Sequence, residues 1–364
     1  GILKYTGNGA QTRTITSGAS GIGGQADFKP DWVVHRIVTN TGQSAGNWDS
    51  TRGFTAATTL DWAENTAEGT WMGADPASYG FVSAVDTDTD GNAEVSLNDG
   101  TATNGGYVNY NSRTYLLWNW KANGGTATAT ISESGNNPAA VVQANPTAGF
   151  SIITYTGTGA NGTIAHGLGV VPKLMIFKNR DATDDWVIYH GANTAAPATD
   201  HLHLNNTLNT ADDATYFNDT EPTSSVFTIG THVGINTDAE KYVVHVFAEI
   251  EGYSKFGGYV GNESSDGTFV FTGFRPAFLI CKIIDGGTTA HYAIFDNKRE
   301  TTNVNDNVLF IDGSAENSAV NDRSVDFLSN GFKLRSSAFR INGSGDNHIY
   351  MAFAEAPFKY ANAK

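Results

Sequence analysis

An internal repeat is the feature that most constrains what this chain can fold into. Five landmarks recur three times in the same order across its 364 residues. In order, they are a Tyr-x-Gly phrase (Tyr5, Tyr155, Tyr259), a proline before an apolar run (Pro30, Pro172, Pro276), an aromatic-rich segment (Trp48, Trp186, Tyr292), a short phenylalanine phrase (Phe81, Phe227, Phe332) and a closing apolar strand (Trp120, Phe247, Phe353). Matching landmarks of the second and third copies lie 104 to 106 residues apart. Constant order and spacing of this kind predict three diverged copies of one structural unit.

Each copy has the pattern of β-strands joined by tight turns. Runs of Val, Ile, Tyr, Phe and Thr are bounded by Gly, Asn, Asp and Pro, and no window has a sustained helical period. Residues 174–177 are apolar at every position, which indicates a strand buried on both faces. We therefore predict an all-β protein of three tandem, diverged β-sandwich modules of the jelly-roll or lectin-like kind.

The predicted modules cover residues 1–125, 126–253 and 254–364. The first carries long loops, and residues 126–146 at the start of the second form a connecting segment rich in turn residues. The third follows the second almost directly. Such a short join predicts a stiff rod of modules rather than beads on a flexible string.

Composition restricts the partners that we expect. The formal net charge is −15, and an acidic surface repels nucleic-acid phosphates and anionic lipids. Solubility in salty water or repulsion between particle surfaces explains this charge, and capture of cations or of a basic partner is the alternative. No stretch approaches the roughly 20 apolar residues that span a bilayer. Neither nucleic-acid binding nor membrane insertion is therefore expected.

Cysteine usage and the first residue add two smaller expectations. Cys281 is the single cysteine, so no intrachain disulfide can form, and its apolar neighbours predict that the thiol is buried. The chain opens on Gly1 rather than Met, from which we expect a processed or missing start.

Several phrases carry a resemblance to a known group of proteins. They are His166-Gly167-Leu168-Gly169 before Pro172, Lys178-Asn179-Arg180, Trp186-Val187, Ser329-Asn330-Gly331-Phe332 and Phe353-Ala354-Glu355. Together with the Tyr-x-Gly openings, they resemble the repeats of virion structural and tail-fibre-like proteins of marine bacteriophages. The resemblance spans nearly the whole chain and is most specific from Phe150 onward. The first copy departs from it, with Gly21-Ile22-Gly23-Gly24 in place of the His-Gly-Leu-Gly phrase. The resemblance implies a place on a virion and carries no catalytic residues.

An acidic run in the first copy is a candidate calcium site. Asp86, Asp88 and Asp90 alternate along the chain and are followed by Gly91, like the first half of an EF-hand loop. The twelfth position of that loop would be a bidentate Glu, but here it is Leu97. The run is therefore either a Ca²⁺ site or a solvated acidic loop.

Aromatic residues in the long loops of the first copy are candidate ligand-binding residues. They are Trp62, Trp71, Tyr79, Tyr107 and Tyr110. Exposed aromatic rings beside Asn and Asp stack on sugar rings or anchor protein interfaces. Burial in the core is the alternative, because Trp and Tyr are mostly buried on average.

The remaining polar residues favour structural roles over catalysis. His201 and His203 share one strand face without an evident third ligand, His166 lies in a turn where it is expected to bond the backbone, and His245 belongs to a core strand. Glu249 and Glu355 recur at the ends of two copies and are expected to pair with Lys or Arg. No Ser-His-Asp order with a nucleophile elbow is present in the sequence. The chain is therefore expected not to be an enzyme, although a pair of glycosidase carboxylates is an alternative.

These expectations combine into a bacteriophage virion structural protein on the particle surface. A tail fibre or fibre-like appendage that adheres to host-surface glycan or protein is the first expectation. Its partners would be other virion proteins and further copies of itself, a homo-oligomer with a trimer favoured. The alternatives are a capsid-decorating or cement protein and a secreted polysaccharide-active enzyme.

Overall fold

The computed structural model describes residues 1–16, 28–39, 45–69, 81–85, 94–98, 106–285, 291–311, 318–319 and 323–355. Strands dominate these ranges, and three large antiparallel sheets are each faced by a small sheet. The predicted all-β class is therefore confirmed. Across the described ranges no helix has the length and apolar character needed to cross a membrane.

The first sheet pair lies in the N-terminal third of the chain. Its large sheet has the order β1 (Ile2–Thr6), β8 (Thr114–Trp120), β3 (Trp32–Ile37), β4 (Ala45–Asp49) and β5 (Leu60–Asp61), and its small sheet the order β2 (Thr12–Thr16), β7 (Glu94–Asn98) and β6 (Phe81–Val85). A 3-10 turn, η1 (Ala56–Thr58), and a single helical turn, α1 (Gly106–Asn109), complete it.

The second sheet pair has the longest sheet. It runs β16 (Ala211–Asp212), β15 (Asp200–His203), β14 (Val187–His190), β13 (Leu174–Asn179), β18 (Lys241–Phe247), β11 (Phe150–Thr156), β10 (Ala140–Asn145) and β9 (Ala129–Ile131). The small sheet is β12 (Gly162–Ala165) with β17 (Val226–Ile229), and the helical turns are α2 (Ala214–Phe217) and α3 (Val233–Asn236).

The third sheet pair repeats this plan. Its large sheet runs β19 (Ser254–Val260), β27 (Asn347–Ala354), β21 (Pro276–Ile283), β22 (Ala293–Asp296), β23 (Asn307–Phe310) and β24 (Ser318–Ala319). Its small sheet is β20 (Phe269–Phe271), β26 (Gly331–Leu334) and β25 (Val325–Leu328), and its helical turn is α4 (Phe339–Asn342).

The tyrosine of each opening phrase makes the same contact in every sheet pair. Its ring lies on the first strand, and its hydroxyl donates to a backbone carbonyl of the short helix that precedes the closing strand. Tyr155 donates to the carbonyl of Ile235 at 2.5 Å and Tyr259 to that of Ile341 at 2.9 Å. Tyr5 makes the matching bond to the carbonyl of Val108. The repeat seen in the sequence thus corresponds to repeated contacts.

In the first copy, the predicted place of the fourth landmark is wrong. The phrase at Phe81 lies in β6, whereas its intended counterparts Phe227 and Phe332 lie in β17 and β26. Those two strands pair with β12 and β20, and in the first copy the strand that pairs with β2 is β7. Val95 therefore occupies the position of Phe227 and Phe332. Short strand phrases are too alike for sequence spacing to separate β6 from β7.

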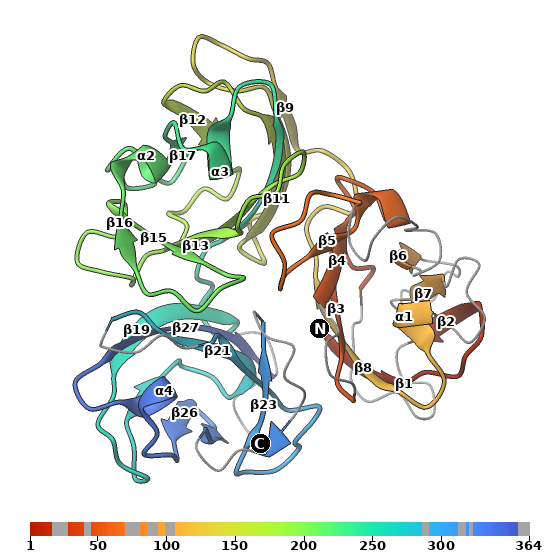
Figure 1. Cartoon of the computed structure of the whole chain (residues 1–364), viewed down its shortest axis with the longest axis vertical. Helices are drawn as coiled ribbons and strands as arrows, with labels where there is room; N and C mark the ends of the chain where they lie inside the picture. The colour runs from red at the N-terminus through yellow and green to blue at the C-terminus, as the bar shows by residue number, and fades with distance from the viewer. Residues whose placement is uncertain are drawn as a thin grey trace.

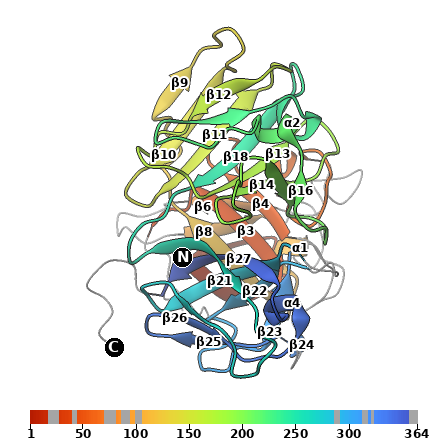
Figure 2. The same ribbon diagram turned by 90° about the vertical axis from the view of Figure 1, so that its left-hand side faces the viewer.

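The predicted rod is wrong, because the three large sheets surround one shared core. Figure 1 shows the large sheets facing the centre of the molecule and the small sheets lying outside them. In the side view of Figure 2, the second sheet pair lies above the third. One cluster of buried side chains draws on all three large sheets, while each sheet pair also has a cluster of its own. This arrangement explains why residues 174–177 of β13 are apolar at every position. One face of the strand packs on its own small sheet, and the other face packs in the shared core.

A triangle of aromatic rings marks the centre of the shared core. Trp120, Phe247 and Phe353 occupy equivalent positions at the ends of the three closing strands. Their ring centroids lie 6.1, 5.9 and 5.8 Å apart, and each pair meets edge to face. This packing favours the aromatic quadrupoles and gives the chain a pseudo-threefold axis.

Buried lysines connect neighbouring sheet pairs in the same rotational sense. Lys178 in β13 donates through Nζ to the carbonyl of Asn65 at 3.1 Å, and Lys282 in β21 to that of Thr207 at 3.0 Å. Asn65 follows β5, and Thr207 follows β15, which is the counterpart of β5 in the second sheet pair. Arg36 in β3 is the third member of this series by strand register. Burial lowers the pKa of Lys178 to about 8.

Candidate functional site

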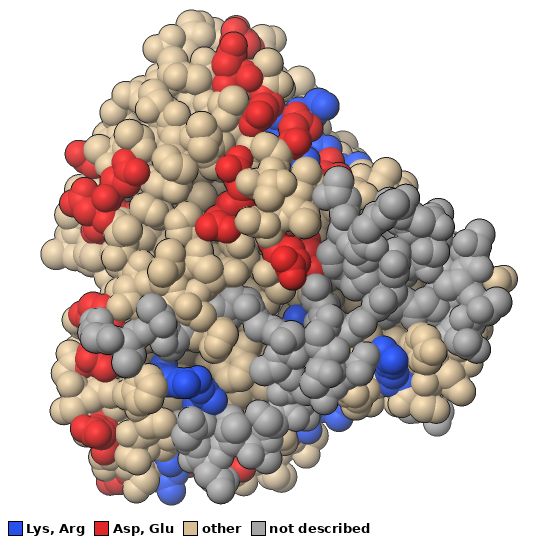
Figure 3. Space-filling model, in the orientation of Figure 1, with Lys and Arg blue, Asp and Glu red and all other residues tan. Residues whose placement is uncertain are grey.

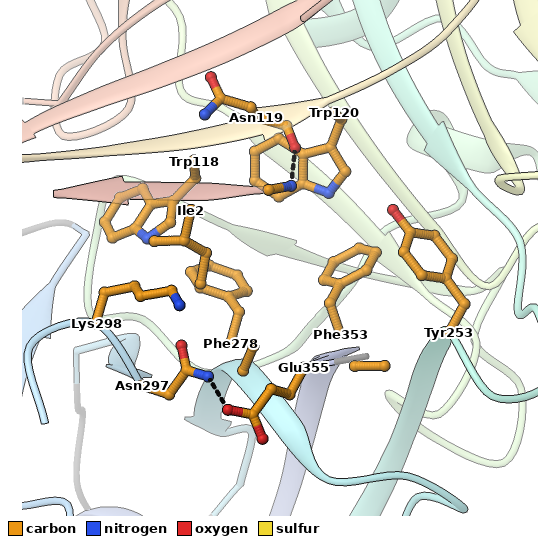
Figure 4. A pocket seen from close by; sticks show the side chains of 13 residues that line it. Ile2, Trp118, Asn119, Trp120, Tyr253, Phe278, Asn297, Lys298, Phe353 and Glu355 are labelled. Carbon is orange, nitrogen blue, oxygen red and sulfur yellow. Dashed lines mark hydrogen bonds between the residues drawn. The ribbon is translucent and has the colours of Figure 1, made fainter. Parts of the chain in front are cut away.

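The three large sheets meet at three junctions, and the candidate site lies at one of them. Between the first and second sheets, Oδ2 of Asp49 in β4 lies 3.5 Å from Nε2 of His245 in β18. The ring of Trp32 stacks on the imidazole of His245. Between the second and third, Nε2 of His190 lies 3.1 Å from the carbonyl of Tyr350. Between the third and first, a cavity of about 300 Å³ opens (Figure 4).

The same turn shapes two of these junctions. Asp49 and Asp296 each accept N–H bonds from the residues two and three positions ahead, and each pairs with an arginine, Arg52 or Arg299, at 2.5 Å. Burial alone raises the pKa of the Asp49 carboxyl, but Arg52 and the neighbouring His245 outweigh it and hold that pKa well below its usual range. The turn therefore presents its two middle residues rigidly to the next sheet.

Aromatic side chains form the wall of the cavity. Figure 4 shows Trp118 and Trp120 from β8 above, with Phe278, Phe353 and Tyr253 around the space. Both tryptophans, Phe278 and Phe353 are buried, and burial raises the pKa of the Tyr253 hydroxyl to about 12. Such a wall suits a ligand with an apolar body.

Polar groups occupy the opposite side of the cavity. The Asn297 amide donates through Nδ2 to Oε1 of Glu355 at 2.9 Å, and Arg275 holds the other carboxylate oxygen at 3.1 Å. Asn297 is only 5 % exposed, and its Oδ1 has no hydrogen-bond partner among the described residues. A buried acceptor without a donor costs about 1–3 kcal/mol. The cavity therefore favours a ligand that brings an N–H or O–H group to this oxygen; Lys298 also lines it.

The family assignment follows from a match along almost the entire chain. The family model described as a domain of unknown function, DUF7483, matches residues 2–357. The chain belongs to the DUF7483 family. No curated protein and no solved structure matches it. Because one family model covers all three sheet pairs, the DUF7483 unit includes the shared core and all three junctions.

Of the aromatic residues predicted as ligand contacts in this DUF7483 chain, the structure describes the side chains of two, Trp62 and Tyr110. Trp62 is 1 % exposed and belongs to the shared core, so its expected place in an exposed loop is wrong. Tyr110 is 38 % exposed, and the guanidinium of Arg113 lies 4.2 Å from its ring centroid. Tyr107 belongs to α1, but the structure does not describe its side chain, and Trp71 and Tyr79 lie outside the described residues.

The structure describes the histidine pair but not the acidic run. Asp86, Asp88 and Asp90 lie outside the described residues, so the calcium prediction stays a prediction. His201 stacks on Tyr216, with His203 beside it, on the outer part of the second sheet pair. In the described part of the chain, no group of three or more His, Cys, Asp or Glu side chains is arranged to hold a metal ion.

Several structural expectations of the sequence are confirmed. Cys281 is buried. His166 bonds the backbone on both sides, at the carbonyl of Thr223 and the amide of Leu168, each at 3.2 Å. Glu249 pairs with Lys255 at 2.9 Å, as Glu355 pairs with Arg275.

The residues around the cavity were not identified as a site from the sequence of this DUF7483 chain. Trp118 and Trp120 stood out only as part of a closing strand. Asn297 and Lys298 stood out only through the match of residues 296–299 to 49–52. This match is the sequence signal for the site. Because residues 49–52 form a turn at one junction, the matching residues 296–299 predict a second junction of the same shape.

Proposed function

We propose that this protein is a structural and ligand-recognising component of a bacteriophage particle, a tail fibre or fibre-like appendage on the virion surface. Its three sheet pairs would be diverged copies of one lectin-like β-sandwich module. The repeated tyrosine contacts, the repeated Asp-x-x-Arg turn and the pseudo-threefold core support that origin, and the resemblance to marine phage virion proteins supports the location.

The cavity between the third and first sheet pairs is the observation that carries the proposal. Its aromatic wall and its buried, unpartnered Asn297 oxygen would hold a flat apolar surface and one hydrogen-bond donor. Host-surface glycans and polypeptides both present that combination. We propose recognition at this cavity, with several copies per particle so that weak contacts add up.

Binding rather than catalysis is the proposed activity. Glycoside hydrolysis generally needs two carboxylates on opposite sides of the bond. Among the described residues that line the cavity, Glu355 is the one carboxylate, and Arg275 and Asn297 already hold both of its oxygens. A carboxylate bound in this way favours a structural role.

The proposed partners are other virion proteins and further copies of this chain. The acidic composition favours a soluble, exposed position, and acidic side chains lie over the second sheet pair on the face shown in Figure 3. A chain with its own pseudo-threefold axis fits onto a threefold position of a particle, which supports assembly at a symmetric site. Calcium at Asp86, Asp88 and Asp90 would add to stability, and we propose it as an accessory only.

Locating the protein on intact particles tests the proposal. Gold-labelled antibodies against the purified chain are expected to decorate tail appendages in electron micrographs. Label spread over the capsid lattice would support the capsid-decorating alternative, and unlabelled particles would overturn both. Sustained hydrolysis of host-surface polysaccharide, lost on a Glu355→Gln change, would overturn the binding role.

A further inference from the structure

In the described part of the chain, the outer edge of the first strand is not paired with another strand. β1 lies at the end of its sheet, paired on one side with β8. The amide of Asn119 donates to the carbonyl of Gly1, so in the alternating pattern of an antiparallel ladder the backbone groups of Ile2 and Lys4 point away from β8. No described strand pairs with that edge. An open edge of this kind is a template for a further strand.

In the second sheet pair, the same edge is covered by the chain itself. β11 is the counterpart of β1, and β10 pairs along its outer side. Gln143 of β10 lies opposite Ile152, which occupies the position of Ile2. Thr154, opposite Val141, occupies the position of Lys4 in the same way.

The Gln143 side chain closes the junction between the first and second sheet pairs. Its Nε2 donates to the hydroxyl oxygens of Ser50 and Thr51 at 2.9 and 2.8 Å. Its Oε1 accepts the backbone N–H groups of Asn123 and Gly125, each at 2.9 Å. One amide side chain thus satisfies four partners in a space that is otherwise walled by the two sheets.

The cavity between the third and first sheet pairs is the counterpart of the space that Gln143 fills. Asn297 and Lys298 follow Asp296 as Ser50 and Thr51 follow Asp49, and both line the cavity. Ile2 lines it from the other side. In the filled junction, the Ser50 hydroxyl receives an amide N–H. In the open one, the buried Oδ1 of Asn297 has no described donor.

We propose that the edge of β1 and this cavity together bind an extended polypeptide strand. The strand would run antiparallel to β1, as β10 does to β11, and would place a Gln or Asn side chain in the cavity with its NH₂ donating to Oδ1 of Asn297. Backbone bonds to Ile2 and Lys4 would supply affinity, and the amide would supply specificity. The inference rests on the proposed function in placing recognition at this cavity, and it names the ligand class.

A peptide copied from β10 is the direct probe. Residues 138–146 as a synthetic peptide, titrated into the whole chain with calorimetry and tryptophan fluorescence as readouts, are expected to bind saturably at one site. Replacing the peptide's glutamine with methionine keeps the length but removes the amide, and is expected to weaken binding about tenfold, or about 1.4 kcal/mol.

A matched pair of chain variants tests the strand geometry. Lys4→Ala and Lys4→Pro both remove the side chain, but only proline removes the outward N–H, and edge positions of sheets tolerate proline. With both variants folded by thermal melting, the proline variant is expected to bind the peptide at least tenfold more weakly than the alanine variant. Equal binding by the pair, or no peptide binding by the unaltered chain, overturns the strand proposal.

Glycan fragments provide the competing outcome. If host-surface oligosaccharides, and not the peptide, bind and are lost on Asn297→Leu, the cavity takes sugar and the strand proposal fails while the proposed adhesive function stands. If gold label is absent from particles but the peptide binds as predicted, the proposed function fails and the strand site stands.

Discussion

At the residue scale, a buried asparagine repeats in all three sheet pairs. Asn236 accepts the N–H of Thr158 at 2.8 Å and donates to the carbonyls of Ala160 and Gly230 at 2.7 and 2.6 Å. Asn342 makes all three corresponding bonds in the third copy, and Asn109 makes the first two in the first copy. This amide ties the turn after the opening strand to the short helix.

Replacing this asparagine should destabilise the protein strongly. Asn236→Ala leaves one amide and two carbonyls without partners, and each unsatisfied buried group costs about 1–3 kcal/mol. We expect a loss of roughly 3 kcal/mol in the free energy of unfolding, measured by urea denaturation. Asn161→Ala, at an exposed amide, is the control and should change it by less than about 0.5 kcal/mol. Equal effects of the two changes would contradict the role of the buried amide.

Glycine in the opening phrase is required by close approach rather than by backbone angle. A Cβ on Gly157 would lie 2.1 Å from the carbonyl oxygen of Thr237, and the same 2.1 Å separates a Cβ on Gly7 from the oxygen of Tyr110. No side chain fits at that distance. The Tyr-x-Gly phrase recurs in the sequence because its tyrosine makes the same hydrogen bond in each copy and its glycine leaves no room for a side chain.

Buried histidines should make the protein sensitive to acid. Burial lowers the pKa of His190 to about 4 and that of His35 to about 3. Because the unfolded chain binds these protons at about pH 6.5, stability is complete above that pH and is lost as the pH falls from 6.5 toward the folded values. We expect roughly 1–2 kcal/mol of loss per histidine between pH 7 and 5.

Measuring the free energy of unfolding by urea at several pH values checks this expectation. His190→Gln should flatten the slope between pH 7 and 5, whatever its effect at pH 8, because glutamine does not titrate. An unchanged slope in that variant would show that His190 does not contribute.

At the scale of elements, β10 is an added strand that seals one junction. It covers the edge of β11, and Gln143 reaches from it into the turn of the first sheet pair. The sequence predicts that residues 126–146 form a connecting segment rich in turn residues. The connection instead contributes β9 and β10. A polar strand residue such as Gln143 resembles a loop residue in a single sequence, because the hydroxyls that it contacts across the junction, on Ser50 and Thr51, lie about 90 residues away.

Removing the Gln143 amide should open that junction. Gln143→Met keeps the approximate length of the side chain but leaves two backbone amides and two hydroxyls without their partner. We expect the free energy of unfolding to fall by roughly 2–4 kcal/mol, measured by urea denaturation. Asn145→Ala, on the same strand but half-buried at its end, should have a smaller effect. If both changes cost the same, Gln143 does not seal the junction.

At the scale of the whole molecule, the shared core makes the three sheet pairs interdependent. The aromatic triangle removes one large side chain from each closing strand from water, so no sheet pair separates without exposing it. Domains that merely follow one another along a rod would have small, polar contacts instead. Unfolding is therefore expected to be one cooperative transition.

A change in the aromatic triangle tests that cooperativity. Phe247→Ala should cost about 3–5 kcal/mol and lower the melting temperature of all three sheet pairs together. Calorimetry, with hydrogen exchange followed separately in each sheet, measures this directly. Separate melting of the second sheet pair, with the other two unchanged, would contradict the single shared core.

The sequence by itself determined the threefold repeat, the all-β class, the tyrosine and glycine of each opening and the likeness of residues 49–52 and 296–299. These depend on local backbone geometry and on contacts inside one copy, which recur with each repeat. Only the tertiary structure decided that the copies close around one core, that Trp62 is buried and that one junction is filled by Gln143 while another holds a cavity. Burial of apolar surface is favourable against any partner. An apolar pattern on both faces of a strand therefore indicates that both faces are buried, but it does not indicate which distant sheet covers them.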